Sequence, residues 1–336
     1  MRTAAVSLFA IVMTVFLTPA DASERLTYPG YRPDSIADIY QGNWKVSEDQ
    51  LSGELHLPAG DGPFPAVVLQ HGSGHPRNLG PWYDKVVPAL LDAGIAALIA
   101  NSYTGRGISG TSGDQRQLSK AARIVDALMA LNALAAHPKI DGGRIGVTGY
   151  SFGGIVSIET ADRRTAEAVL GPDLKFAAHL PVYPSCGSHR AKIDMTGSPM
   201  LFLAGRQDDY TPAEFCEEYL PKLKAAGVPA EIKVYDDAGH GFVKVQDRYL
   251  QNAATFNDCG ISTISEEGYH EIEGMSEKGM SWAEMIVEAF KKCGSRGASL
   301  YGTRESQRLA LEDTVGFFKR TLKDRKSTRL NSSHQI

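Results

Sequence analysis

Short apolar runs alternate along the chain with longer stretches in which apolar residues recur at helical spacing. The short runs have the length and the bounding turn residues of buried strands, and they lie at residues 64–70, 95–100, 144–148, 177–182, 200–204 and 230–235. Helical spacing occurs at residues 115–136, 153–162, 212–226 and 306–322. This alternation predicts an α/β fold, with a mainly parallel sheet and helices on both faces.

An insertion interrupts the alternation near its end. Residues 53–57 predict an earlier, antiparallel edge strand, whereas residues 243–300 are irregular, with several glycines and one expected helix at 282–291. This insertion follows the last strand, and ligands of such sheets bind at the carboxyl ends of the strands. We therefore expect a flap beside the active-site edge of a single domain spanning residues 23–325, because 336 residues are few for two α/β domains.

The two ends of the chain do not fit this pattern. A basic start, an apolar run at residues 4–17 and small residues at Ala20 and Ala22 predict a signal peptide over residues 1–22. The run is shorter than the roughly 20 residues of a spanning helix, so we expect a secreted or periplasmic protein with no stable membrane insertion after cleavage; an uncleaved anchor is the alternative. Residues 326–336 are polar and aperiodic, and we interpret them as a non-native or disordered tail.

Export makes the four cysteines interpretable, because an oxidising compartment favours disulfides. Four cysteines allow three pairings. We favour Cys186–Cys216 and Cys259–Cys293, since each pair would join one local region. The net charge of −4 and the lack of a basic run give no reason to expect a nucleic-acid partner.

Ser151 is the strongest candidate for chemistry. It lies in Gly149-Tyr150-Ser151-Phe152-Gly153, after one expected strand and before an expected helix. A G-x-S-x-G pattern in this context is typical of a serine nucleophile on a sharp strand-to-helix turn, where flanking glycines prevent clashes. The alternative is an ordinary turn serine.

An acid and a base follow Ser151 in the order serine, aspartate, histidine, which is the order expected when a nucleophilic serine lies on such a strand-to-helix turn. Asp208 comes after the strand at 200–204, with Asp209 as the rival acid, and His240 comes after the strand at 230–235. His240 would take the proton of the serine, and the aspartate would orient the imidazole.

Two backbone N–H groups are needed to bind the developing oxyanion. We expect one from Phe152, directly after the nucleophile, and one from Ser73 in the glycine-rich turn after the strand at residues 64–70, with Gly74 as the alternative. His71 and His75 are four residues apart, but the glycines around them argue against a helical metal-ligand pair, so we expect both to be structural.

Four motifs in this order resemble the dienelactone hydrolase family of α/β-hydrolases. They are Gln70-His71-Gly72, Gly149-Tyr150-Ser151-Phe152-Gly153-Gly154, Gly205-Arg206-Gln207-Asp208 and Gly239-His240-Gly241-Phe242. The resemblance implies an α/β-hydrolase fold that cleaves small-molecule esters without a metal or an organic cofactor.

The chain departs from the family's namesake enzymes in two ways. They use a cysteine nucleophile where this chain has Ser151, and serine members resemble general esterases or, in some cases, acyl peptidases. They also bind the carboxylate of the lactone with arginines. Arg106 and Lys244 are the candidates here for binding an anionic substrate group, and solvated surface charge is the alternative.

The main prediction is therefore hydrolysis of carboxylic esters through an acyl-enzyme. A peptidase using the same triad and a non-catalytic binding protein on this scaffold are the alternatives. The short stretch between Ser151 and Asp208 leaves little room for a lid and favours an open pocket for small esters, unless the insertion changes this.

Overall fold

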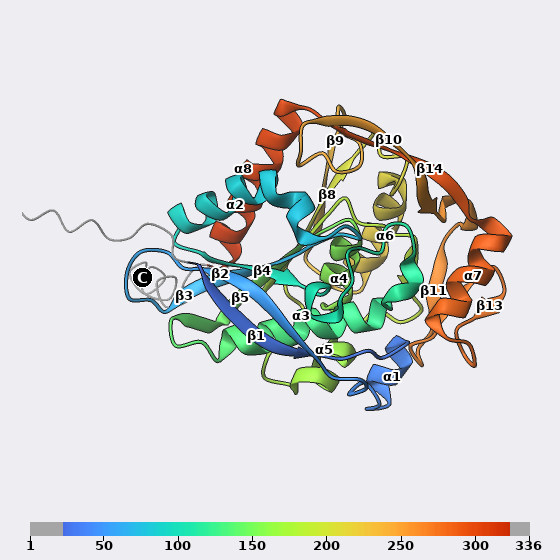
Figure 1. The fold of residues 1–336 in the computed structure, drawn as a ribbon, viewed down its shortest axis with the longest axis horizontal. Helices are drawn as coiled ribbons and strands as arrows, with labels where there is room; N and C mark the ends of the chain where they lie inside the picture. Colours follow the sequence, from blue (N-terminus) through green and yellow to red (C-terminus); the bar gives the residue numbers. More distant parts are fainter. Residues whose placement is uncertain (1–22, 323–336) are drawn as a thin grey trace, which may run out of the picture.

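A central sheet of eight strands organises the computed structural model, which describes residues 23–322 (Figure 1). The strand order is β1-β2-β4-β3-β5-β6-β8-β9, with β1 and β2 antiparallel at one edge and the other six strands parallel. The strands are β1 (Glu24–Gly30), β2 (Asp49–His56), β3 (Phe64–Gln70), β4 (Ala96–Asn101), β5 (Ile140–Tyr150), β6 (Ala178–Val182), β8 (Met200–Gly205) and β9 (Ala230–Tyr235). The predicted mainly parallel sheet is confirmed, and β1 is an additional edge strand.

Helices cover both faces of this sheet because successive residues of its strands point to opposite sides. In β3, Val67 and Leu69 pack toward α2 and α8, whereas Ala66 and Val68 pack toward α3. Figure 1 shows α2 and α8 together on one side of the sheet and α3 and α5 on the other. The helices of this body are α1 (Ile36–Tyr40), α2 (Gly80–Asp92), α3 (Lys120–Ala135), α4 (Phe152–Glu159), α5 (Arg163–Leu170), α6 (Ala213–Ala225) and α8 (Arg304–Thr321).

Capping side chains set two helix boundaries that periodicity misplaced. The helix expected from residue 115 begins at Lys120, because the Ser119 side chain accepts a hydrogen bond from Ala122 N and ends the extended segment before it. The helix expected over 153–162 ends at Glu159, and Asp162 then caps a second helix, α5, by accepting from Thr165 N.

The insertion is ordered rather than irregular, which corrects the expectation from sequence. Strands β10 (Gln246–Thr255) and β14 (Ser295–Gly302) form an antiparallel ribbon. Strands β11 (Ser262–Ile264), β12 (His270–Ile272) and β13 (Met275–Ser276) extend β7 (Ser188–Arg190) of the body, with β11 parallel to β7. Helix α7 (Trp282–Cys293) is where a helix was expected. We call residues 246–302 the roof.

Both predicted disulfides are present. Cys186–Cys216 joins the loop after β6 to α6, and Cys259–Cys293 joins the 3-10 turn η4 (Asn257–Cys259) to α7 within the roof. Across residues 23–322, no helix has the length and apolar character needed to span a membrane. The predicted signal peptide (1–22) and tail (326–336) lie outside the described residues.

Candidate active site

Ser151 occupies a strained turn between β5 and α4. Its φ of 57° and ψ of −117° are unusual for a residue with a side chain. A Cβ at Gly149 would lie 1.8 Å from Gly153 O, and one at Gly153 would lie 2.4 Å from Gln70 O. Both glycines are therefore required by the turn, which is the packing that the sequence motif predicts.

The structure brings Ser151, His240 and Asp208 into one hydrogen-bonded chain. His240 Nε2 lies 3.0 Å from Ser151 Oγ, and His240 Nδ1 lies 3.0 Å from Asp208 Oδ2. The side chains of His240 and Asp208 are buried. The rival Asp209 instead accepts a hydrogen bond from Ser299 N, 2.8 Å away in the roof. Geometry thus favours Asp208 as the partner of His240, and the catalytic roles stay predictions.

Asp208 is held by more donors than His240 alone. Its Oδ1 accepts from Tyr210 N at 2.9 Å and Thr211 N at 2.7 Å, and its Oδ2 accepts from Thr211 Oγ1 at 2.9 Å. Together these contacts fix the orientation of the carboxylate beside His240. Thr211 was not identified from the sequence, although a hydroxyl residue three positions after an aspartate has the spacing at which the aspartate side chain can bond both its hydroxyl and its backbone N–H.

The expected oxyanion site has two N–H groups available. Among the described residues, neither Ser73 N nor Phe152 N has a protein acceptor. His71 fixes the turn that carries Ser73: its Nε2 accepts from Ser102 N, so Nδ1 carries the proton and donates to the Gly72 and Gly74 carbonyls. Burial holds the pKa of His71 well below its usual range, so this donor is neutral. The structural role expected for His71 fits these contacts.

Arg123 supports the same turn and was not identified from sequence. Its buried guanidinium donates to Gly72 O at 3.0 Å and lies 5.0 Å from the centre of the Phe152 ring. It therefore contacts both segments that carry the expected oxyanion donors. The sequence did contain a signal for this role, because Arg123 lies within the apolar stretch of α3. A charged residue that is buried in such a stretch needs a partner.

Arg106 does not reach the site, which corrects the prediction that it binds substrate. Its side chain is fully buried and pairs with Asp49 at 2.7 Å and Asp126 at 2.6 Å, so it joins β2 to α3. Lys244 does line a cavity that Ser151 and His240 also line. Its Nζ donates to Asn78 O at 3.0 Å.

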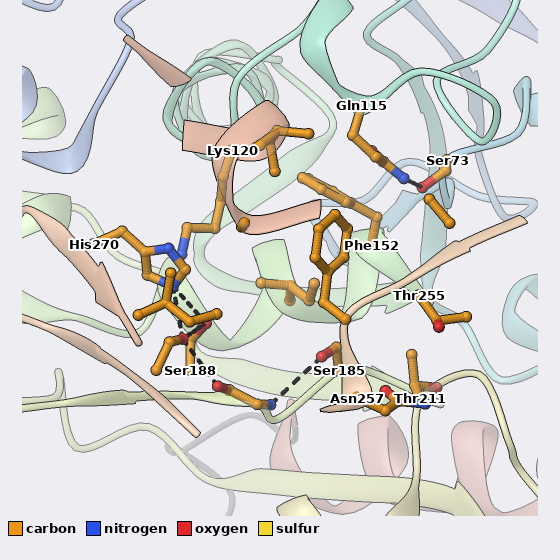
Figure 2. A pocket seen from close by; sticks show the side chains of 18 of the residues that line it. Ser73, Gln115, Lys120, Phe152, Ser185, Ser188, Thr211, Thr255, Asn257 and His270 are labelled. Atoms are coloured by element: carbon orange, nitrogen blue, oxygen red, sulfur yellow. Dashed lines mark hydrogen bonds between the residues drawn. The ribbon is translucent and has the colours of Figure 1, made fainter. Parts of the chain in front are cut away.

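Two cavities meet at Ser151. The first, which we call the roof cavity, is lined by Ser73, Ser151 and Phe152 of the body and by residues of the roof from Ala254 to Ala289 (Figure 2). The second, the histidine cavity, is lined by Ser151, His240 and Lys244 among others. The insertion therefore supplies one wall of the site, which is the exception that the expectation of an open pocket allowed for.

Within residues 23–322, no group of three or more His, Cys, Asp or Glu side chains is placed to hold a metal ion. His75, the other half of the pair considered from sequence, lies 3.1 Å through Nε2 from Thr104 Oγ1.

Comparisons with known proteins agree with this geometry. The model of the dienelactone hydrolase family matches residues 51–260. Esterase EstD of Thermotoga maritima is 31% identical over 131 residues, which are 37% of this chain and 30% of that protein. A carboxymethylenebutenolidase of Rhodococcus opacus is 28% identical over 169 residues, 48% of this chain and 65% of that protein. The chain thus spans less than two thirds of the length of each.

The chain is also similar to solved structures. A putative dienelactone hydrolase from Klebsiella pneumoniae has a TM-score of 0.45 and 19% identity, covering 65% of this chain and 88% of that one. Thermogutta terrifontis esterase 2, phosphorylated by paraoxon, has a TM-score of 0.46 and 19% identity, covering 66% and 85%.

Proposed function

The chain belongs to the dienelactone hydrolase family, and from this premise we propose that it is a serine esterase that cleaves carboxylic esters through an acyl-enzyme. The observation that carries the proposal is the hydrogen-bonded chain from Ser151 Oγ through His240 to Asp208, at the strained turn after β5. A serine hydroxyl is a weak nucleophile unless a base takes its proton, and His240 Nε2 is placed to do so.

The proposed reaction has two halves. Ser151 Oγ attacks the ester carbonyl while His240 Nε2 accepts its proton, and the N–H groups of Phe152 and Ser73 bind the oxyanion. His240 then protonates the leaving alcohol, and the acyl group stays on Ser151. A water molecule that gives its proton to His240 attacks the acyl-enzyme, and Ser151 recovers its proton when the acid leaves.

The positions of the two cavities support a proposal for where the two parts of the ester bind. The leaving oxygen must receive a proton from His240, so the alcohol belongs in the histidine cavity, which His240 lines. The acyl group then extends into the roof cavity, whose lining includes Ser151 and Phe152 but not His240. We propose that the roof selects the acyl group.

Purified protein starting at Ser23 should be tested on p-nitrophenyl esters of increasing acyl length, beside Ser151→Ala. We expect Ser151→Ala to lower kcat/KM by several powers of ten. Ser276→Ala, a roof serine outside both cavities, is the matched control and should keep the parent rate. If parent and Ser151→Ala are equally inert, the esterase proposal is wrong, and a peptide screen becomes the next experiment.

We also propose that the protein acts outside the cytoplasm, secreted or periplasmic. The two disulfides support this proposal, because such bonds persist in oxidising compartments.

A further inference from the structure

Lys120 contributes an unusual charge to the roof cavity. It is the first residue of α3, is only 6% exposed, and lines the cavity with His270, Ser188 and Ser262. Figure 2 shows Lys120 reaching toward His270, on the other side of Phe152 from Ser73. This polar group lies where β7 and β11 meet, since Ser188 and Ser262 are paired residues of these strands.

The ammonium group of Lys120 has no partner within residues 23–322: no acceptor lies at hydrogen-bonding distance and no carboxylate at ion-pair distance of its Nζ. The two acids whose charges act on Lys120 are engaged elsewhere. Glu159 pairs with Arg190, and Glu277 accepts from His270 N at 3.0 Å. Burial raises the pKa of Glu277 to about 7, so it is a weak counter-charge.

The surroundings of Lys120 make this charge costly. A buried cation without a counter-ion loses hydration free energy, and no ion pair offsets this loss. Lys120 also lies at the N-terminus of a 16-residue helix, where the macrodipole is positive and disfavours a cation. His270 offers no negative charge, and burial together with Lys120 holds its pKa well below the usual range. An anion entering the cavity would offset all of these costs at once.

The remaining lining defines what kind of anion fits. Apolar side chains form much of the wall of the cavity that Ser151 and Lys120 share: Phe152 and Ile155 of the body with the roof residues Ile272, Met285 and Ile286. Lys120 is the one cation among the residues that line this cavity, since the hydroxyls of Ser188 and Ser262 are neutral and are hydrogen-bonded to His270 Nε2 at 2.9 and 2.8 Å. One cation matches a single negative charge. A phosphate dianion is a poorer match, because it would need a second cation.

We propose that Lys120 binds a carboxylate at the far end of the acyl chain, so that the preferred substrates are half-esters of dicarboxylic acids with an apolar spacer. This inference rests on the proposed esterase function and on the placement of the acyl group in the roof cavity. It differs from the roles expected for Arg106 and Lys244, since neither lines this cavity.

The test compares two p-nitrophenyl esters of equal chain length, the neutral hexanoate and the mono-adipate, with longer half-esters such as suberate to find the best length. We expect the parent to prefer the acidic ester at its best length by roughly tenfold or more in kcat/KM. In Lys120→Met the acidic ester should lose this advantage while the hexanoate gains, because the cavity loses its one charged side chain and becomes more apolar. Lys224→Met, an exposed lysine of α6, is the matched control and should keep the parent preference.

A folded Lys120→Met that lowers both esters equally, or a parent without preference at any length, would overturn the proposal. Should Lys120→Met fail to fold, calorimetry on Ser151→Ala decides. That variant should bind monomethyl adipate or suberate more tightly than the neutral methyl esters, and equal binding would overturn the proposal. A parent that hydrolyses neither ester would refute the esterase function. The titration needs no turnover, so it would still test the carboxylate site in that case.

Discussion

Thr211 contacts both members of the acid–base pair. Its Oγ1 lies 2.9 Å from Asp208 Oδ2 and 3.0 Å from His240 Nδ1, and the carbonyl oxygen of Tyr183 lies 3.2 Å away. A hydroxyl in this position keeps the carboxylate aligned with the Nδ1–H of the histidine. Thr211 is therefore a positioning residue that acts through Asp208 and His240.

Replacing Thr211 with valine keeps the volume and removes the hydroxyl. We expect kcat for p-nitrophenyl acetate to fall roughly tenfold, with a smaller change in KM, because a hydrogen bond to a charged group is lost. Thr211→Ser should restore most of the rate. Steady-state kinetics of the two variants check this, and an unchanged kcat in Thr211→Val would show that the hydroxyl is only structural.

Candidate site residues could be predicted where the neighbouring sequence alone points to them. Ser151 is marked by its flanking glycines, and His240 by its place after the last strand. Asp208 and Asp209 are adjacent, so only the fold could show which one faces the histidine. Arg106 looked exposed between two glycines but lies in ion pairs with β2 and α3, contacts made between distant parts of the chain.

At the scale of elements, the Cys259–Cys293 disulfide fixes the turn η4 against the end of α7. Both of these roof segments line the cavity in which the acyl group is proposed to bind. Loss of the bond should therefore loosen the wall of the acyl site more than the triad.

We expect Cys259→Ser combined with Cys293→Ser to raise KM for the longest accepted ester, with little effect on the acetate ester, whose acyl group is too short to reach α7. The free energy of unfolding should fall by about 3 kcal/mol, since the closed loop no longer restricts the unfolded chain. Kinetics and chemical denaturation measure the two effects. An equal rise in KM for the acetate ester would contradict the assignment of the acyl group to this cavity.

Elements of the body were predictable because strand and helix periods are clear in buried segments. The roof was not, since its strands are short and pair with distant residues. β11 has three residues, and its parallel partner β7 lies far earlier in the chain. Capping residues such as Ser119 and Asp162 set helix boundaries that periodicity alone misplaced.

At the scale of the whole molecule, the roof places Glu277 in a buried position that affects global stability. Its carboxyl is 5% exposed, and burial raises its pKa from 4.5 to about 7. A raised carboxyl pKa means that the folded state disfavours ionisation. The folded protein therefore loses stability as pH rises from about 4.5 to about 7, and the loss is constant above that range.

Glu277→Gln should remove this loss while its amide oxygen still accepts from His270 N. We expect the variant and the parent to unfold alike near pH 4.5, and the variant to be more stable by about 3 kcal/mol above pH 7. Thermal or urea unfolding across this range measures the difference. Glu271→Gln, at an exposed position of β12, is the matched control. A difference that does not grow with pH would contradict the proposed origin.

The ribbon of β10 and β14 brings the two ends of the roof together. Gln246 pairs with Gly302, so the chain enters and leaves the roof through two neighbouring backbones. This crossing is tight: a Cβ at Gly302 would lie 2.2 Å from Lys244 O. The roof is thus one contiguous segment whose two ends lie side by side, and it also contacts the body where β11 pairs with β7. Exchange of a segment that keeps this pairing would change the wall of the acyl site while the sheet and Ser151 stay unchanged.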